Sequence, residues 1–255
     1  MLEVDFHCHS LFSTCGLHTI IELLTYAKSK GLKALAVTDH GTAQDGHISS
    51  PFFDRLVDPV EGIRLLKGQE SNIVDDDGRI DFPLKFLINT DIVLVGLHPN
   101  LDKRPRRTDY TGMVLKTLEK NPFVDILTHL NDTTYPVDYG QVIAAAKRRG
   151  MAIEFNNSKT LYGKVPPQAT SRLIDACKNA GCRAVIDSDA HALHEIGLDD
   201  AIRPLLEAAQ FPRELIINDN ARRAFDFIEE RRAVKRDFLQ RLNTTTALGG
   251  NAAHG

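Results

Sequence analysis

The sequence of 255 residues lacks the features that direct a protein to nucleic acid or to a membrane. Its 31 lysines and arginines are outnumbered by 34 aspartates and glutamates, whereas a general nucleic-acid binder is usually basic. No apolar run approaches the length of a membrane span, and the first residues lack the basic-then-apolar pattern of a signal peptide. We therefore expect a cytoplasmic protein with no membrane contact, and we do not expect nucleic acid as its partner.

Cysteine and phosphate-binding glycine motifs are also scarce. The four cysteines lack the paired spacing of a metal finger, so reduced thiols are expected. Neither G-x-G-x-x-G nor G-x-x-x-x-G-K-[ST] occurs, which weighs against a nucleotide-binding doubly wound fold. No repeat or linker marks a second domain. We expect one domain over residues 1–242 and a disordered tail over residues 243–255, which have little to bury.

Apolar, β-rich runs alternate with helical periodicity along the chain. The runs read as nearly continuous hydrophobic stretches, as parallel strands covered on both faces do; they lie at 4–7, 34–38, 65–68, 92–97, 124–127, 152–155 and 184–187. Helices are expected at about 19–29, 111–120, 137–149, 168–180, 198–209 and 220–242, and a hairpin turn at 74–80. Glycines 31, 150 and 181 each stand where a helix ends. About seven β-then-α units favour a single α/β barrel.

Metal-ligand residue types follow six of these seven runs. His7 and His9 follow the first, and because side chains alternate along a strand, both are expected to point the same way. The others are followed by Asp39 and His40, Glu70, His98, His129, and Asp189 with His191. The sixth run ends in Glu154-Phe155-Asn156-Asn157, which is polar but not obviously ligating. Since the carboxyl ends of parallel barrel strands converge on one mouth, these side chains are expected to meet.

The residue types indicate which ions would bind. Imidazole with carboxylate suits zinc, manganese or iron, whereas calcium and magnesium prefer oxygen ligands. Eight such side chains exceed what one four-coordinate ion can use, so we expect two to three divalent ions, with a carboxylate such as Glu70 between them. Clustered ions hold a phosphoryl group and generate hydroxide at neutral pH, which makes hydrolysis of phosphoesters the predicted chemistry.

Five segments, in order, resemble the motifs of the PHP (polymerase and histidinol phosphatase) family. They are DFHCHS at 5–10, TDHG at 38–41, GQESN at 68–72, GLH at 96–98 and DSDAH at 187–191. The chain is most similar to the small stand-alone bacterial phosphatases of that family, over residues 2–232. The resemblance implies an α/β fold of the distorted (β/α)7 TIM-like barrel type, with three metals at its C-terminal mouth.

The resemblance also implies a ligand set. One ion would be held by His7, His9, Glu70 and Asp189, a second by Glu70, His98 and His129, and a third by His40 and His191. The family usually has a histidine where this chain has Cys15. As a thiolate, Cys15 can still ligate and would bias the third site toward zinc or iron. Alternatively His18 reaches the site, or only two ions bind firmly; we favour Cys15.

Supporting residues are expected around the ligands. Asp5 stands two residues before His7, and Asp39 stands beside His40. Each would accept the second N–H of a metal-bound histidine, or bond to backbone instead. Asp39 is also a candidate general acid and joins Glu70 and Asp189 as a candidate catalytic residue.

A small phosphorylated metabolite is the expected partner, with inorganic phosphate as the product. Substrate contacts are expected from the basic loop after His98, with Arg104, Arg106 and Arg107, and from Lys159. We therefore expect a metal-dependent phosphatase that hydrolyses small phosphomonoesters by metal-activated hydroxide. The alternatives are a nuclease or phosphodiesterase of the polymerase-associated branch, and a catalytically silent metal-binding scaffold.

Overall fold

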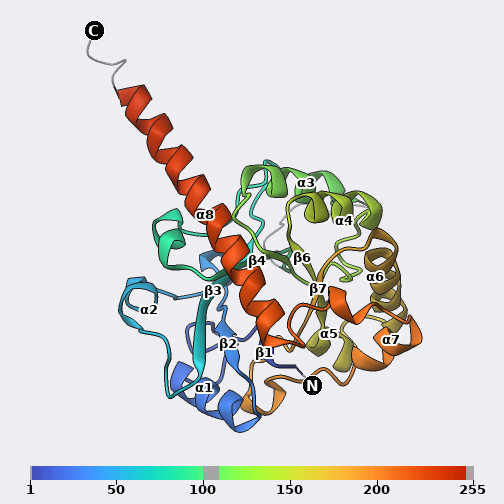
Figure 1. The fold of residues 1–255 in the computed structure, drawn as a ribbon. Coiled ribbons are helices and arrows are strands. Elements are labelled where there is room, and N and C mark those ends of the chain that lie inside the picture. The colour runs from blue at the N-terminus through green and yellow to red at the C-terminus, as the bar shows by residue number, and fades with distance from the viewer. Residues whose placement is uncertain (1, 100–108, 251–255) are drawn as a thin grey trace.

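Seven parallel strands form a nearly closed barrel in this computed structural model, which describes residues 2–99 and 109–250, with side chains described as far as Thr244. The strands are neighbours in chain order: β1 Val4–Asp5, β2 Ala34–Val37, β3 Arg64–Asn72, β4 Ile92–Gly96, β5 Ile126–Leu127, β6 Ala152–Asn156 and β7 Ala184–Asp187 (Figure 1). The expected distorted (β/α)7 TIM-like barrel is confirmed.

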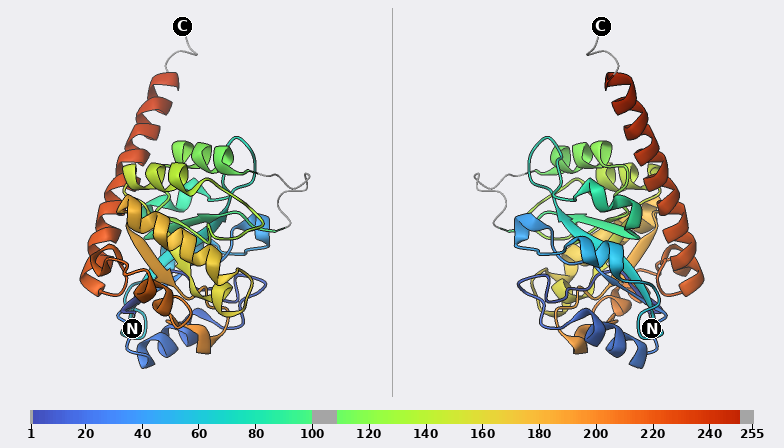
Figure 2. Two further views of the ribbon diagram at one scale, coloured as in Figure 1. Left: turned by 90° about the vertical axis from the view of Figure 1, so that its right-hand side faces the viewer. Right: turned by 90° about the vertical axis from the view of Figure 1, so that its left-hand side faces the viewer.

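Helices surround the barrel: α1 Ile20–Ser29, α2 Ser50–Arg55, α3 Thr111–Lys120, α4 Tyr139–Arg148, α5 Asn157–Leu161, α6 Pro167–Ala180, α7 Arg203–Ala208 and α8 Ala221–Gly250 (Figures 1 and 2). The short α2 and α5 were not expected from periodicity. The helix expected from residue 198 begins at Arg203, because Pro204 lacks an N–H and suits the first turn. Gly31, Gly150 and Gly181 follow α1, α4 and α6 with φ of 86°, 66° and 59°, as expected.

The barrel interior is filled by alternate residues of the strands. Val4 and Phe6, Ala34 and Ala36, Leu66, Ile92 and Leu94, Ile126, Ala152 and Val185 form one buried cluster. Ala224, Phe227 and Ile228 of α8 belong to the same cluster and therefore close the amino-terminal end of the barrel. With period two, the inward positions that follow toward the carboxyl end are Gly68 and Glu70 in β3 and Glu154 in β6. The apolar core thus gives way to carboxylates toward the other end.

β1 and β7 meet through fewer backbone bonds than the other neighbours. Cys8 and Ala190 form a parallel bridge, and the N–H of His9 donates to the carbonyl of Ala190 at 2.8 Å. Nearer the amino-terminal end, the amide of Asn218 donates to the carbonyls of Val4 and Ile186 at 3.0 and 2.6 Å. This side chain substitutes for part of the missing ladder and brings the segments after β1 and β7 together.

Helix α8 is longer than the sequence indicated. It ends at Gly250 rather than near residue 242, so the segment expected as a tail is helical as far as Gly250. The first part of α8 is anchored by packing, so the helix can continue without a new nucleation cost. In this continued part the hydroxyl of Thr244 donates to the carbonyl of Gln240, one turn earlier, at 2.9 Å. Figure 2 shows α8 running along one side of the barrel, with its end projecting beyond the body. Among residues 2–99 and 109–250, no helix could span a membrane.

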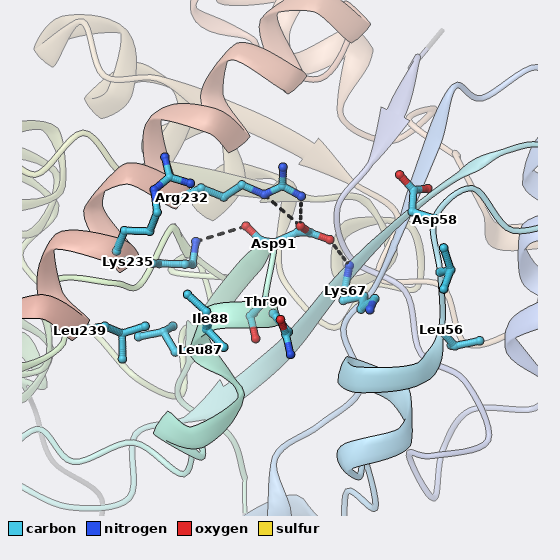
Figure 3. A pocket seen from close by; sticks show the side chains of 13 residues that line it. Leu56, Asp58, Lys67, Leu87, Ile88, Thr90, Asp91, Arg232, Lys235 and Leu239 are labelled. Carbon is cyan, nitrogen blue, oxygen red and sulfur yellow. Dashed lines mark hydrogen bonds and ion pairs between the residues drawn. The ribbon is translucent and has the colours of Figure 1, made fainter. Parts of the chain in front are cut away.

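Buried charges join α8 to the amino-terminal end of the barrel. The carboxylate of Asp125, fully buried, accepts from Arg231 at 2.9 Å and from Lys235 at 2.5 Å, and also from the backbone N–H of Val93 at 2.7 Å. Beside it Asp91 accepts from Arg232 and from the N–H of Lys67 (Figure 3).

Asp125→Asn is expected to lower the free energy of unfolding by about 3 to 5 kcal/mol, because it removes the carboxylate charge that two buried cations contact. Urea denaturation measures this. The matched variant Asp237→Asn removes an exposed carboxylate paired with Arg241 at 2.9 Å, and should cost less than about 1 kcal/mol. Equal losses in the two variants would contradict the role assigned to Asp125.

A pocket of about 470 Å³ opens beside this ion-pair cluster, between α8 and the segments before β3 and β4 (Figure 3). Three of its four cations, Lys67, Arg232 and Lys235, are already bonded, to the carbonyl of Phe53, to Asp91 and to Asp125; the fourth is Arg236. These partners connect elements of the fold to one another. The pocket therefore belongs to the packing of α8, and ligand-type side chains gather at the opposite end.

Candidate metal centre

Nine side chains predicted as ligands converge at the carboxyl end of the barrel. Three groups have ligand atoms within 4.8 Å of one another: His7, His9 and Asp189; His40, Glu70 and His98; and His9, Cys15, His40 and His191. His129 adjoins the second group, with its Nε2 3.2 Å from Nε2 of His98. The structure thus brings together the residues that the sequence placed at six strand ends. Their role as ligands stays a prediction.

Glu70 occupies the centre of the cluster. Its Oε1 lies 2.9 Å from Nε2 of His98 and 3.0 Å from Nε2 of His129. Its Oε2 lies 2.8 Å from Nδ1 of His40 and 3.4 Å from Nε2 of His7. The side chain is only 1% exposed. One carboxylate therefore faces imidazoles on both sides, as a bridging ligand does.

The deepest group lies between β1 and β7. Nε2 of His9 is 3.1 Å from Nε2 of His7 and 3.1 Å from Oδ1 of Asp189. His7 Nε2 is 3.4 Å from the same carboxylate oxygen. The three atoms point at one another. A ring nitrogen either donates or accepts a hydrogen bond, so neither Nε2 can satisfy both of its neighbours in this group by hydrogen bonding.

Cys15 lies at the outer part of the cluster, among the imidazoles of His9, His40 and His191. Its side chain is exposed, yet it is close enough to His191 and His40 to bond with both. Partial burial would raise the pKa of this thiol, but these two histidines outweigh it and lower the pKa to about 6. At neutral pH Cys15 is therefore mainly a thiolate, the form of cysteine that binds metal ions. His18, the alternative, is in none of the described ligand groups.

The charges of the cluster are mutually dependent. Burial alone would lower the pKa of His40, but Glu70 and Cys15 raise it to about 10, and the pKa of His191 rises to about 9 through Cys15 and Asp189. Burial, with three neighbouring imidazoles, lowers the pKa of His9 to about 3. Without an ion, protonated histidines therefore carry the positive charge that offsets the carboxylates. Bound metal cations would take over this role.

The donor set fits divalent ions. Oε2 of Glu70 and Nδ1 of His40 are buried and lack a hydrogen bond, although the two atoms are 2.8 Å apart. Buried polar atoms are rarely left in this way, because each costs about 1 to 3 kcal/mol. An ion between them would satisfy both. Imidazole, carboxylate and thiolate together suit zinc, iron or manganese better than calcium.

The two supporting carboxylates, Asp39 and Asp5, accept backbone N–H groups, the alternative expected for them, rather than a histidine ring. Asp39 accepts from the N–H and the hydroxyl of Ser10 at 2.7 and 2.6 Å, and from the hydroxyl of Ser13 at 2.7 Å. It therefore holds the loop after β1 and lies outside the ligand groups, and its expected catalytic role stays a prediction. Ser13 in turn contacts Nδ1 of His9 at 3.2 Å, so Asp39 acts on this ligand only indirectly.

Asp5 does not contact the ring of His7. It accepts from the hydroxyl of Ser188 at 2.5 Å and from the N–H of Gly197 at 2.9 Å. Val4 and Phe6 fill the barrel interior, so Asp5 points outward, to the segment after β7. The partner of His7 is Glu154 of β6, which sequence reasoning missed, with 2.6 Å between Nδ1 and Oε1. A charged residue at an inward position of an otherwise apolar strand was the available signal.

A pocket of about 430 Å³ opens onto the cluster. Its lining includes Cys15, Glu70 and His191, and two lysines, Lys159 and Lys164. The ammonium of Lys159 lies 3.3 Å from Oδ2 of Asp132. Lys164 was not singled out from the sequence. Arg104, Arg106 and Arg107, expected to bind substrate, lie outside the described residues.

Sequence comparison agrees with this geometry. The PHP domain family matches residues 5–139, which carry most of the ligand-type side chains. The chain belongs to the PHP family. A probable phosphatase of Caldanaerobacter subterraneus is 35% identical over 236 residues, 91% of this chain and 92% of its own. This PHP protein is thus one of the stand-alone bacterial phosphatases and a hydrolase of phosphoric esters.

Solved structures share the fold of this PHP protein. A histidinol phosphate phosphatase of Lactococcus lactis, complexed with zinc, L-histidinol and phosphate, superposes with a TM-score of 0.58 at 17% identity, over 82% of this chain and 94% of its own. A chain of an archaeal ribonuclease P bound to mature tRNA superposes with a TM-score of 0.57 at 15% identity, over 91% and 93%. The fold therefore gives no support to the expected exclusion of nucleic acid.

Proposed function

We propose that this PHP phosphatase hydrolyses small phosphomonoesters with two to three divalent ions at the carboxyl end of the barrel, releasing inorganic phosphate. The observation that carries the proposal is Glu70, whose two oxygens face separate sets of imidazoles at 2.8 to 3.4 Å. A carboxylate placed in this way can join two ions. Clustered ions clamp a phosphoryl group from both sides.

The ligands divide among three positions. His7, His9, Glu70 and Asp189 would hold one ion; Glu70, His98 and His129 a second; His40, His191 and Cys15 a third. When bound, the ions supply a nucleophile at neutral pH and neutralise charge that develops on the phosphoryl oxygens. Zinc, iron and manganese are the candidates, and zinc is present in the histidinol phosphate phosphatase with this fold.

The pocket supports a small substrate. Its volume of about 430 Å³ lies within the range of sites for small molecules. Lys159 and Lys164 stand at its wall, where an ammonium can hold a phosphate oxygen. An ion pair with Asp132 holds the ammonium group of Lys159 in place, close enough to His129 to affect its pKa.

The substrate class is tested with two nitrophenyl esters on zinc- or manganese-loaded protein. We expect hydrolysis of p-nitrophenyl phosphate at a kcat/KM at least about tenfold above that of bis(p-nitrophenyl) phosphate, because the pocket is closed by the barrel on one side. A preference for the diester would favour a phosphodiesterase. No hydrolysis of either ester, with metal bound, would favour the silent scaffold.

Cys15 is proposed as a ligand of the third ion. Elemental analysis of purified Cys15→Ala should show one ion fewer than the parent, and Cys15→His should restore it, because imidazole can replace thiolate at this position. Cys177→Ala is the control: this thiol is buried away from the cluster and should leave the count unchanged. An unchanged count in Cys15→Ala would reject the assignment.

A further inference from the structure

β6 has no residue in the three ligand groups, yet it supplies two buried polar side chains to the same end of the barrel. Glu154 and Asn156 lie two residues apart, so both point inward, and both are 0% exposed. A carboxylate and an amide with no access to water must serve other groups there. Their partners are residues of the proposed metal centre.

Glu154 bonds to two of the proposed ligands through its two oxygens. Oε1 lies 2.6 Å from Nδ1 of His7, and Oε2 accepts the backbone N–H of His129 at 2.8 Å. A carboxylate only accepts, so the proton of the His7 ring lies on Nδ1. Nε2 of His7 faces Glu70 and Asp189, at 3.4 Å from each, and is the nitrogen left to bind an ion once the ring is neutral.

Asn156 extends the contact to Asp189. Its Oδ1 accepts the N–H of Lys159 at 2.9 Å, at the start of α5, and this fixes which way the amide points. Its Nδ2 therefore faces inward, where it donates to Oε2 of Glu154 and to Oδ2 of Asp189, at 3.1 Å in both cases. The amide joins two carboxylates that would otherwise repel each other.

Two residues held by this pair have an unusual backbone. His129 has φ of 34° and Asp189 has φ of 51°, in the left-handed region that side chains other than glycine seldom adopt. Such a conformation costs of order 1 to 3 kcal/mol and persists only where neighbours hold it. Glu154 binds the backbone of His129, and Asn156 binds the carboxylate of Asp189.

We propose that Glu154 and Asn156 are the positioning residues of the metal centre: Glu154 sets the tautomer of His7 and the backbone of His129, and Asn156 orients Asp189. The inference rests on the proposed function, because it concerns residues assigned there as ligands. β6 thus acts on three ligands from β1, β5 and β7 without being a ligand strand. Outer partners of this kind typically change metal affinity by about ten- to hundredfold.

The decisive variant is Glu154→Gln, which keeps the shape of the side chain but leaves one accepting oxygen for the three donors, on His7, His129 and Asn156. Zinc affinity is measured by competition with a chromophoric chelator, and the cobalt-loaded protein is examined by its visible absorption spectrum. We expect zinc to bind about ten- to hundredfold more weakly, with a shifted cobalt spectrum. Asn156→Ser, which retains a capping oxygen for α5, should weaken zinc about tenfold.

Asp125→Asn is the matched control, since it also converts a fully buried carboxylate that accepts a backbone N–H, but at the other end of the barrel. It should lower stability and leave zinc affinity and the cobalt spectrum unchanged. Affinity within twofold of the parent in Glu154→Gln and Asn156→Ser would overturn the inference. If Glu154→Gln does not fold, Asn156→Ser decides the question. If the parent binds none of zinc, iron and manganese, the proposed function itself fails.

Discussion

Glu70→Gln is expected to lower kcat/KM for a phosphomonoester by about two to three orders of magnitude, a loss of roughly 3 to 4 kcal/mol of transition-state stabilisation. Glutamine keeps the size of the side chain but replaces one oxygen by an amide nitrogen, which cannot bind a cation. The nitrogen replaces one of two oxygens: either the one that faces His98 and His129, or the one that faces His7 and His40. Steady-state kinetics with and without added zinc measures the effect.

The control for this variant is Glu230→Gln. Glu230 lies on α8 and pairs with Arg183 at 2.7 Å, half-exposed and remote from the barrel mouth. The same chemical change there should leave kcat/KM within about twofold. Full activity in Glu70→Gln would mean that the carboxylate does not join two ions, and the proposed mechanism would be wrong.

Removal of divalent ions with a chelator is expected to abolish hydrolysis and to lower the melting temperature. An ion present at a hundredfold excess over its Kd stabilises the folded state by about 2.7 kcal/mol, which for a chain of this size corresponds to roughly 5 to 10 °C. Zinc or manganese should restore both properties. Scanning calorimetry and a phosphate-release assay follow them on one sample, and chelated protein that keeps full activity would exclude a metal-dependent reaction.

Reloading should also release protons. Without an ion, His40 and His191 have pKa values of about 10 and 9, above neutral pH, so their rings are cationic at pH 7. A bound ion must displace those protons, and affinity therefore falls as the pH is lowered. Titration calorimetry in two buffers of different ionisation enthalpy gives the number released. In Glu70→Gln the number should be smaller, because Glu70 contributes to the raised pKa of His40.

Much of the fold was predictable from local sequence. Nearly continuous apolar runs predicted all seven strands, and the glycines after α1, α4 and α6 marked the helix ends, because both patterns depend on neighbouring residues alone. The boundaries of α7 and α8 were less accurate. Pro204 delayed one helix, and packing of the first half of α8 against the barrel allowed the other to continue.

The meeting of His7, His9, His40, Glu70, His98, His129, Asp189 and His191 was likewise predictable. In a barrel of parallel strands, the residues that directly follow the strands all lie at the same end of the barrel. The position of a residue after a strand therefore predicts that it lies near the others. The pairing of supporting carboxylates was not predictable in this way. Asp5 was the expected partner of His7, but Glu154, distant in the chain, occupies that place.

The sequence by itself therefore determined the barrel, the end at which its ligand-type side chains gather, and the family to which it belongs. Only the tertiary structure decided that Asp5 points outward, that Asp39 binds Ser10 and Ser13, and that Glu154 faces His7. The physical reason is that β1 ends at Asp5, so strand alternation no longer puts Asp5 and His7 on one face. The stagger between strands then sets which residue of a neighbouring strand each side chain meets.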